Sequence, residues 1–159
     1  MKLSIIAVGR LKEKYLKEGI AEYSKRLSRF CDLEIIEVDD EQAPESLSSA
    51  QELQLKKKEA EKIRKKIKDG SVIIALDVKG VKLDSVNFAK KLQSFFISGN
   101  SNITLIIGGS LGMDEDLLKT AHLRFSMSDL TFPHQLTRLI LLEQLFRCFK
   151  ILNGETYHK

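Results

Sequence analysis

The residues best suited to acid–base chemistry and to gripping an unpaired base lie in the last quarter of the 159-residue sequence. His134 and Arg138 are four residues apart at the start of a predicted helix, so they share one of its faces. The chain closes on Tyr157, His158 and Lys159, whose aromatic, imidazole and ammonium groups could stack on and hold such a base. Simpler interpretations stay open: the helical pair could be solvent-exposed polar residues, and the terminus could be a frayed tail.

A second candidate site is the glycine-rich string IGGSLG at residues 107–112, which follows an apolar run directly. Ligands of open α/β sheets bind beyond the carboxyl ends of the strands, and glycine lets the backbone approach them closely. A dinucleotide would suit this position, because Asp129 follows about twenty residues later, where an acid would bind the ribose. The fingerprint fails at its first glycine, where Ile107 stands, and a plain tight turn remains open. A P-loop is excluded, since no Gly-Lys-Ser/Thr follows and the acids at 114–116 would repel phosphate.

Other catalytic classes lack the residues they need. Cys31 and Cys148 are far apart, without CxxC spacing and without a neighbouring histidine, so the sequence predicts neither a zinc site nor a disulfide framework. No serine or cysteine is placed as an activated nucleophile, and no histidine and carboxylate pair has metal-ligand spacing. We therefore expect no metal and no hydrolase chemistry, which leaves transfer chemistry that needs positioning alone.

Short apolar runs alternate with segments of helical periodicity, and this alternation predicts parallel strands joined by helices. The runs VIIAL and ITLII lack in/out alternation, which predicts central strands covered by helices on both faces. Thr131 is expected to cap the last helix, and Asn153-Gly154 to end it. The predicted strands are residues 3–8, 33–38, 72–76, 103–107 and 123–127, and the predicted helices are residues 12–30, about 48–68, a segment capped by Asp84, 114–120 and 133–152.

Length and composition place these elements in a single domain. A chain of 159 residues has the usual size of one domain, and 43% hydrophobic against 30% charged residues is typical of globular proteins. No run approaches roughly eighteen consecutive apolar residues, and the first residues do not form a secretory signal, so we expect a soluble, cytoplasmic protein without a membrane partner. Basic residues concentrate at 10–30 and 56–68, and acids at 32–52. The basic segments would suit RNA or DNA, and they would equally suit solvated helix faces.

Four strings of the sequence, taken together, point to a known family. The strings VGRLKE, IGGSLG, LTFPHQLTRLILLEQLFR and GETYHK occur in this order over the whole length of the chain. In this combination the sequence resembles the small bacterial ribosomal RNA methyltransferases that methylate N3 of a pseudouridine in 23S rRNA, a minimal branch of the SPOUT class. Members of this family act late, on assembled ribosomes.

The resemblance implies a fold and a cofactor. Members are α/β homodimers with an open, mainly parallel sheet between helices, and their carboxyl-terminal part, here about residues 70–159, is tied in a trefoil knot. The knot forms the S-adenosylmethionine site. The family varies at Asp129, so no ribose contact is assigned to it. Carried over by position, the cofactor-binding residues are Leu76, Gly108, Met127, Ser128, Asp129, Leu130, Thr131 and Phe132.

The same resemblance gives the C-terminal residues catalytic roles. Arg138 would stabilise negative charge developing on the uracil carbonyl oxygens, and His134 or His158 would accept the N3 proton. Tyr157 would stack on the base or donate a hydrogen bond to it. Phosphate contacts would come from Arg147, Lys150 and the basic face of residues 12–29, and the helix 133–152 would contribute to the dimer contact.

Two other classes of protein remain as alternatives. A non-catalytic RNA-binding or ribosome-associated module would share the basic helices but would not need a glycine turn at a strand end. A nucleotide-cofactor oxidoreductase would share the α/β alternation but not the broken dinucleotide fingerprint. Binding of S-adenosylmethionine, compared with binding of NADH, separates all three.

Overall fold

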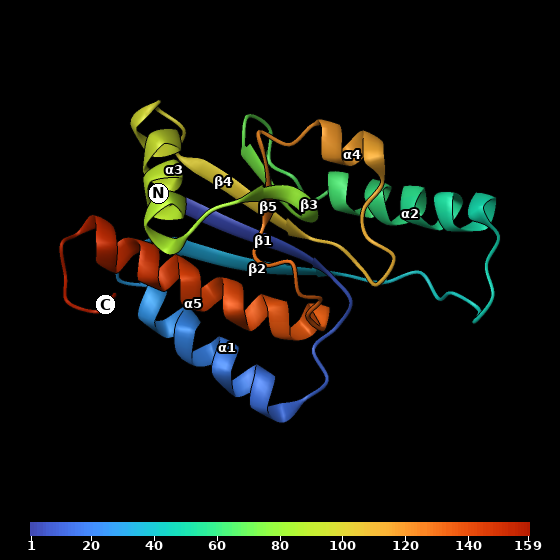
Figure 1. The fold of residues 1–159 in the computed structure, drawn as a ribbon, viewed down its shortest axis with the longest axis horizontal. Helices are drawn as coiled ribbons and strands as arrows, with labels where there is room; N and C mark the ends of the chain where they lie inside the picture. The colour runs from blue at the N-terminus through green and yellow to red at the C-terminus, as the bar shows by residue number, and fades with distance from the viewer.

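Five strands form one sheet in the computed structural model, which describes residues 1–159. The strand order is β2-β1-β4-β3-β5, and every pair of neighbours is parallel. The sheet is therefore fully parallel, and the two runs predicted as central strands, β3 and β4, both lie inside it (Figure 1). The strands are β1 (Lys2–Val8), β2 (Asp32–Val38), β3 (Val72–Lys82), β4 (Asn102–Ile107) and β5 (Leu123–Ser126).

Four helices connect the strands and a fifth follows β5, and local sequence signals set several of their ends. Asp84 Oδ1 accepts a 2.7 Å hydrogen bond from the Asn87 N–H and so caps α3, as predicted. Ser48 and Gln51 form a reciprocal capping box at the start of α2. Gly154, with φ 65°, follows the end of α5. The helices are α1 (Lys14–Leu27), α2 (Ser49–Arg64), α3 (Ser85–Ile97), α4 (Glu115–Lys119) and α5 (His134–Leu152).

The prediction that Thr131 caps the last helix is wrong. Pro133 occupies the N-cap position of α5 and no side chain caps it. The hydroxyl of Thr137 instead donates to the Pro133 carbonyl at 3.2 Å. A residue that precedes proline is disfavoured in the helical region, so the helix does not extend back to Phe132, and Thr131 lies two residues before the N-cap position.

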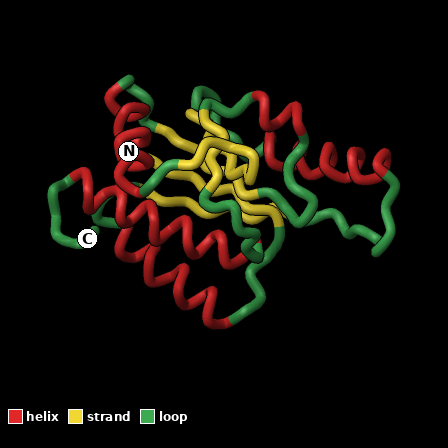
Figure 2. Tube along the Cα trace, in the orientation of Figure 1, coloured by secondary structure: helices red, strands yellow, loops and turns green.

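Alternate residues of the strands face two separate hydrophobic clusters. In β1, Leu3, Ile5 and Ala7 pack into the larger cluster, whereas Ile6 and Val8 pack into the smaller one. The larger cluster includes side chains of α1, α3 and α5, and the smaller one includes side chains of α2 and α4. Helices thus cover both faces of the sheet, as predicted from its unbroken apolar runs (Figure 2).

One contact of the larger cluster fixes the strand that leads into the candidate site. The rings of Phe88 in α3 and Phe125 in β5 stack with their centroids 4.3 Å apart, and both are buried. A stacked aromatic pair adds about 0.5–1.5 kcal/mol to the free energy gained by burial. This stacking anchors β5 just before the chain enters the loop at 127–133.

The chain reaches β5 out of sequence order, since β5 pairs with β3 and not with β4. After β4 the chain therefore passes beyond β3 before it returns to the sheet. The trefoil knot that the resemblance implies for about residues 70–159 stays a prediction here.

Both cysteines are buried, which predicts thiols that do not react in the folded protein. Burial raises the pKa of Cys31 to about 11 and that of Cys148 to about 12, and the thiolate is the reactive form. At pH 8 we expect neither thiol to react with Ellman's reagent in the native protein, and both to react in guanidinium chloride. Rapid reaction of either thiol in the native protein would contradict this placement.

Candidate active site

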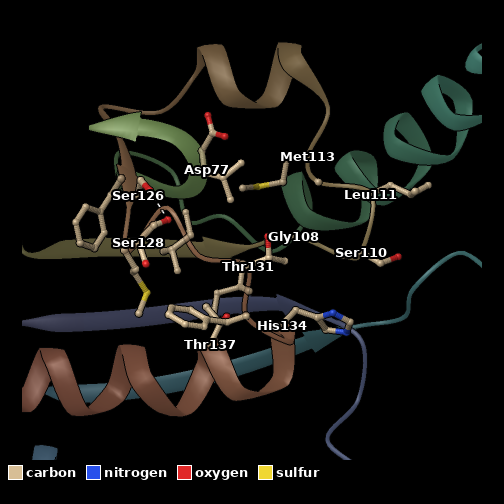
Figure 3. Close-up of a pocket in the computed structure, with 18 of the residues that line it drawn as sticks. Asp77, Gly108, Ser110, Leu111, Met113, Ser126, Ser128, Thr131, His134 and Thr137 are labelled. Carbon is tan, nitrogen blue, oxygen red and sulfur yellow. Dashed lines mark hydrogen bonds between the residues drawn. The ribbon is translucent and has the colours of Figure 1, made fainter. Parts of the chain in front are cut away.

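A cavity of about 390 Å³ lies at the carboxyl edge of the sheet. Its walls come from three neighbouring strands and the loops after two of them: residues 76–78 at the register shift within β3, residues 107–113 from the end of β4 onward, and residues 125–132 from the end of β5 onward, Asp129 excepted. Leu118 of α4 and, at the start of α5, His134 and Thr137 complete the lining (Figure 3). The sequence predicted a ligand at this edge, and the size is that of a small-molecule or cofactor site.

Backbone and small polar groups, rather than charged side chains, supply most of the polar lining of this cavity. The Ser126 hydroxyl donates to the Ser128 carbonyl at 3.1 Å, and the Leu130 N–H donates to the Ser128 Oγ at 3.0 Å. These bonds fold the 126–130 loop back on itself beside the cavity (Figure 3). The remaining lining is largely apolar, so the site suits a ligand with a flat hydrophobic part and few charges.

The glycine turn after β4 has no room for a side chain at its first glycine, Gly108. Gly112 has φ 86°, and its N–H donates to the Gly109 carbonyl at 3.1 Å. A Cβ at Gly108 would lie 2.7 Å from Cγ of Met113, which itself lines the cavity. A side chain here would push that thioether out of place, so glycine keeps the cavity open.

An ion-pair network holds the irregular middle of β3, where Asp77 lies. Arg124 of β5 donates to Asp77 at 2.9 Å and to Glu115 of α4 at 3.0 Å. The other oxygen of Asp77 accepts the Lys79 N–H at 3.1 Å. Asp77 is the only carboxylate that lines the cavity, and Arg124 already binds it. Its ion pair therefore stabilises the cavity wall rather than binding a ligand.

Seven of the eight predicted cofactor residues line this cavity, and Asp129 is the exception. The side chain of Asp129 is 76% exposed and forms an ion pair with Lys82 at 2.6 Å. The acid that would have supported a dinucleotide site thus points away from the cavity. The residues that do line it are Leu76, Gly108, Met127, Ser128, Leu130, Thr131 and Phe132.

The four predicted catalytic residues do not meet within one chain. His134 lies at the rim of the cavity, and neither of its ring nitrogens bonds another protein group. Tyr157 donates to Glu143 at 3.2 Å, nine residues further along α5, which is about 13 Å from His134 along the helix. His158 contacts Arg147 in the same place. The C-terminus therefore lies at the opposite end of α5 from His134 (Figure 1).

The side chain of Arg138, in the second turn of α5, points into the protein and is buried, and it is not exposed beside His134. Its side chain is 1% exposed and donates to Glu37 at 2.7 Å and to the Gly9 carbonyl at 3.2 Å. Partial burial alone would raise the pKa of Glu37, but the bonds from Arg138 and from the Leu11 N–H hold it below its usual range. Arg138 thus ties α5 to the ends of β1 and β2.

The C-terminal tail packs against α5 and is not frayed. The Tyr157 ring meets Phe146 edge-on with centroids 5.0 Å apart. Burial, with Tyr23 and Glu143 nearby, raises the pKa of Tyr157 to about 12, so its hydroxyl is a hydrogen-bond donor at neutral pH. Arg147 is paired with Glu143, and Lys150 with Glu155, so both predicted phosphate contacts are engaged within the chain.

Comparison with known proteins identifies this architecture. The family model described as a predicted SPOUT methyltransferase matches residues 1–158. The chain belongs to the SPOUT methyltransferase family. It is 64% identical to the ribosomal RNA large subunit methyltransferase H of Acetivibrio thermocellus and 60% identical to the protein of the same name from Ruminiclostridium cellulolyticum. Both matches cover 100% of this chain and 100% of the relative, which confirms the resemblance found in the sequence.

A solved structure shares the fold of this SPOUT methyltransferase. A probable methylase family protein from Haemophilus influenzae superposes with a TM-score of 0.53 at 15% sequence identity. The match covers 96% of this chain and 66% of that one, so the chain spans about two thirds of its length. In the methyltransferase described here, no helix is long and apolar enough to cross a membrane.

Sequence reasoning missed three of the four residues whose ion pairs hold this site, Glu37, Asp77 and Arg124, and it assigned the fourth, Arg138, a catalytic role. Asp77 and Arg124 are 47 positions apart, and Glu37 and Arg138 are 101 apart. Each pair joins two elements, and no local pattern marks such partners. The position of Glu37 and Asp77 at or just beyond the ends of apolar runs was the one available signal.

Proposed function

We propose that this protein transfers the methyl group of S-adenosylmethionine to N3 of a pseudouridine in 23S rRNA, on the assembled ribosome in the cytoplasm. The observation that carries the proposal is the cavity at the carboxyl edge, lined by residues of β3 and of the segments after β4 and β5, in a chain whose full-length relatives are named ribosomal RNA large subunit methyltransferases. A non-catalytic RNA-binding module would have no use for such a cavity. Calorimetry with S-adenosylmethionine and with NADH tests the cofactor: binding of the first alone supports the proposal.

The residues present fit S-adenosylmethionine. Adenine and the methionine arm need hydrogen bonds and a close backbone, which Gly108 and the 127–132 loop offer. No lysine or arginine lines the cavity, as a phosphate ligand would require. No group of three His, Cys, Asp or Glu side chains could hold a metal ion. When bound, the cofactor supplies an activated methyl group, so the protein's task is to orient the base and to remove its proton.

We assign proton removal to His134, because its free ring nitrogens lie at the cavity rim. Arg138 contributes to the same step indirectly, by positioning His134. Its buried guanidinium, bonded to Gly9 and Glu37, holds the first turn of α5 and therefore the imidazole. A His134→Asn variant that binds the cofactor normally should lose at least about a hundredfold in rate, which is the range for general-base catalysis. A wild-type rate would remove His134 from the mechanism.

We further propose that the enzyme is a homodimer in which the partner's tail brings Tyr157 and His158 to the site. Within one chain these residues are anchored far from His134, and the apolar side chains of Leu136 and Ile140 on α5 are only partly covered. Each site would then need His134 from one subunit and the tail from the other.

Mixed dimers test this arrangement directly. A His134→Asn chain and a chain lacking residues 157–159 should each be inactive alone. After subunit exchange, about a quarter of the wild-type activity should return, because half of the dimers are mixed and each has one intact site. No recovery, in dimers shown to have exchanged, would mean that each chain uses its own tail.

A Gly108→Ala variant tests the cofactor cavity. Its Cβ would displace Met113 into the cavity, so affinity for S-adenosylmethionine should fall by about tenfold while thermal stability changes little. Calorimetry measures the affinity. Adding Met113→Ala to the same chain should restore part of it. If Gly108→Ala binds the cofactor normally, the cavity is not the cofactor site.

A further inference from the structure

A second, smaller cavity adjoins the cofactor cavity, and the proposed function does not use it. Its volume is about 30 Å³, which is room for one or two water molecules. The turn residues 109–111 and His134 line both cavities, so together they form the wall between them. The small cavity is also lined by the carboxylates of Asp40, Glu41 and Glu59.

Glu59 is the buried acid of this small cavity. The residue is 5% exposed, and its Oε2 accepts the Glu41 N–H at 3.0 Å. Its Oε1 accepts no hydrogen bond from the protein, and a Cβ placed at Gly109 would lie 3.2 Å from it. Lys62, on the next turn of α2, is paired with Glu41 at 2.9 Å and leaves Glu59 without a cation. Burial raises the pKa of Glu59 above its usual range, despite the bond from Glu41.

The imidazole of His134 lies between the two cavities with both ring nitrogens available. Its Nε2 would be 3.8 Å from a Cβ at Gly9, at the end of β1. In Figure 3 the ring points away from Ser128 and Thr131, toward the side where Ser110 lies. One nitrogen can therefore serve a base in the large cavity while the other meets water in the small one.

Carboxylates are the charged groups that share the small cavity with His134. Asp40, Glu41 and Glu59 line it from the loop after β2 and from α2. On α5 itself, Arg138 follows one turn later, and Glu37 and the Gly9 carbonyl engage it. No lysine or arginine lines this cavity, so its carboxylates are available to receive a proton from the imidazole.

We propose that Glu59 is the proton acceptor behind His134, reached through water in the small cavity; this inference rests on the proposed function. As the bond from N3 to the methyl carbon forms, the carbon–sulfur bond breaks and its electron pair stays on sulfur. The N3 proton passes to one nitrogen of His134. The other nitrogen gives its proton to a cavity water, and that water gives one to Glu59 Oε1. Glu59 later releases the proton to solvent past Asp40, and it is a positioning and relay residue that never touches substrate.

Glu59→Gln tests the relay, because the amide still accepts the Glu41 N–H but cannot take up a proton. We expect unchanged cofactor affinity and a single-turnover methylation rate about tenfold lower, partly restored by added formate or imidazole as small proton carriers. Glu61→Gln is the matched control, since Glu61 is exposed on the same helix and forms no ion pair; it should behave as wild type. A wild-type rate in Glu59→Gln, or a loss that no proton carrier restores, overturns the relay.

A second measurement needs no catalysis, and its decisive result comes from the wild-type protein. In the wild-type protein without cofactor, the carbon resonances of the His134 ring should show an inflection at the pH where Glu59 titrates, above the usual glutamate range. In Glu59→Gln this inflection should vanish. Its absence in wild type would overturn the relay even if the variant failed to fold. If His134→Asn methylates at the wild-type rate, the assignment of His134 fails first, so the two failures are distinguishable.

Discussion

Replacing Gly80 with alanine should destabilise the protein by about 3 kcal/mol or more, the largest loss expected from adding one methyl group. Gly80 lies in β3 at the register shift between Leu76 and Val81, where the pairing with β5 is irregular. A Cβ at this position would lie 2.5 Å from the Arg124 carbonyl oxygen and 2.8 Å from the Phe125 nitrogen. These are backbone atoms of the neighbouring strand, so no side chain can move aside and the two strands must separate.

Thermal unfolding measures this effect. For a chain of this size a loss of about 3 kcal/mol lowers Tm by roughly 6–12 °C. Gly70→Ala is a suitable control, because Gly70 has φ 74° but nothing within 4 Å of its Cβ position; it should cost only about 1 kcal/mol of backbone strain. Because β5 leads into the 126–130 loop, Gly80→Ala should also weaken cofactor binding at temperatures where it is still folded. A Gly80→Ala protein as stable as Gly70→Ala would contradict the close pairing of the two strands.

Arg138→Met should lower the free energy of unfolding by about 2–3 kcal/mol at pH 7 and abolish most of the activity. Methionine fills the aliphatic space, but the Gly9 carbonyl loses its buried donor and Glu37 loses its cation. The loss falls below the range for a fully buried ion pair because Glu37 is 37% exposed and water can reach it. Arg138 Nε also has no partner in the wild type, so its removal costs nothing.

The effect of Arg138→Met should depend on pH in a defined direction. The pKa of Glu37 is lowered in the folded protein, so its interaction with Arg138 stabilises the fold above the usual glutamate pKa and is lost as the pH falls through the lowered value. The stability difference between wild type and Arg138→Met should therefore shrink below about pH 4. Urea unfolding at several pH values measures it, with Glu37→Gln as a control that shows the same trend. A difference that stays constant from pH 7 to pH 3 would mean that the ion pair is not the cause.

The sequence predicted the elements of this fold well, because their signals are local. Unbroken apolar runs marked β3 and β4 as central strands, and Asp84 marked the start of α3. The observed ends of several strands and helices differ from the predicted ends by a few residues. The extension of β3 to Lys82 was not predicted, since it depends on pairing with β5 and on the absence of a side chain at Gly80.

The sequence predicted the loops that line the site but not the ion pairs that hold them in place. The rule that ligands bind beyond the carboxyl ends of parallel strands placed the cavity beside Gly108, and the family resemblance placed the 127–132 loop in it. Spacing on one helix suggested that Arg138 would stand beside His134, yet the structure buries Arg138 against Glu37. Whether Arg138 is exposed or buried depends on how α5 packs against the ends of β1 and β2. The four-residue spacing from His134 carries no information about this packing.

The central claim is most directly tested by methylation of ribosomes from cells that lack this gene. The purified protein is mixed with these ribosomes and methyl-labelled S-adenosylmethionine, and the label is mapped by nuclease digestion and mass spectrometry. We predict one label, on N3 of a pseudouridine in 23S rRNA. If the protein binds the cofactor but labels neither assembled ribosomes nor free 23S rRNA, the proposed substrate is wrong. If it binds no S-adenosylmethionine, the assignment of the cavity is contradicted as well.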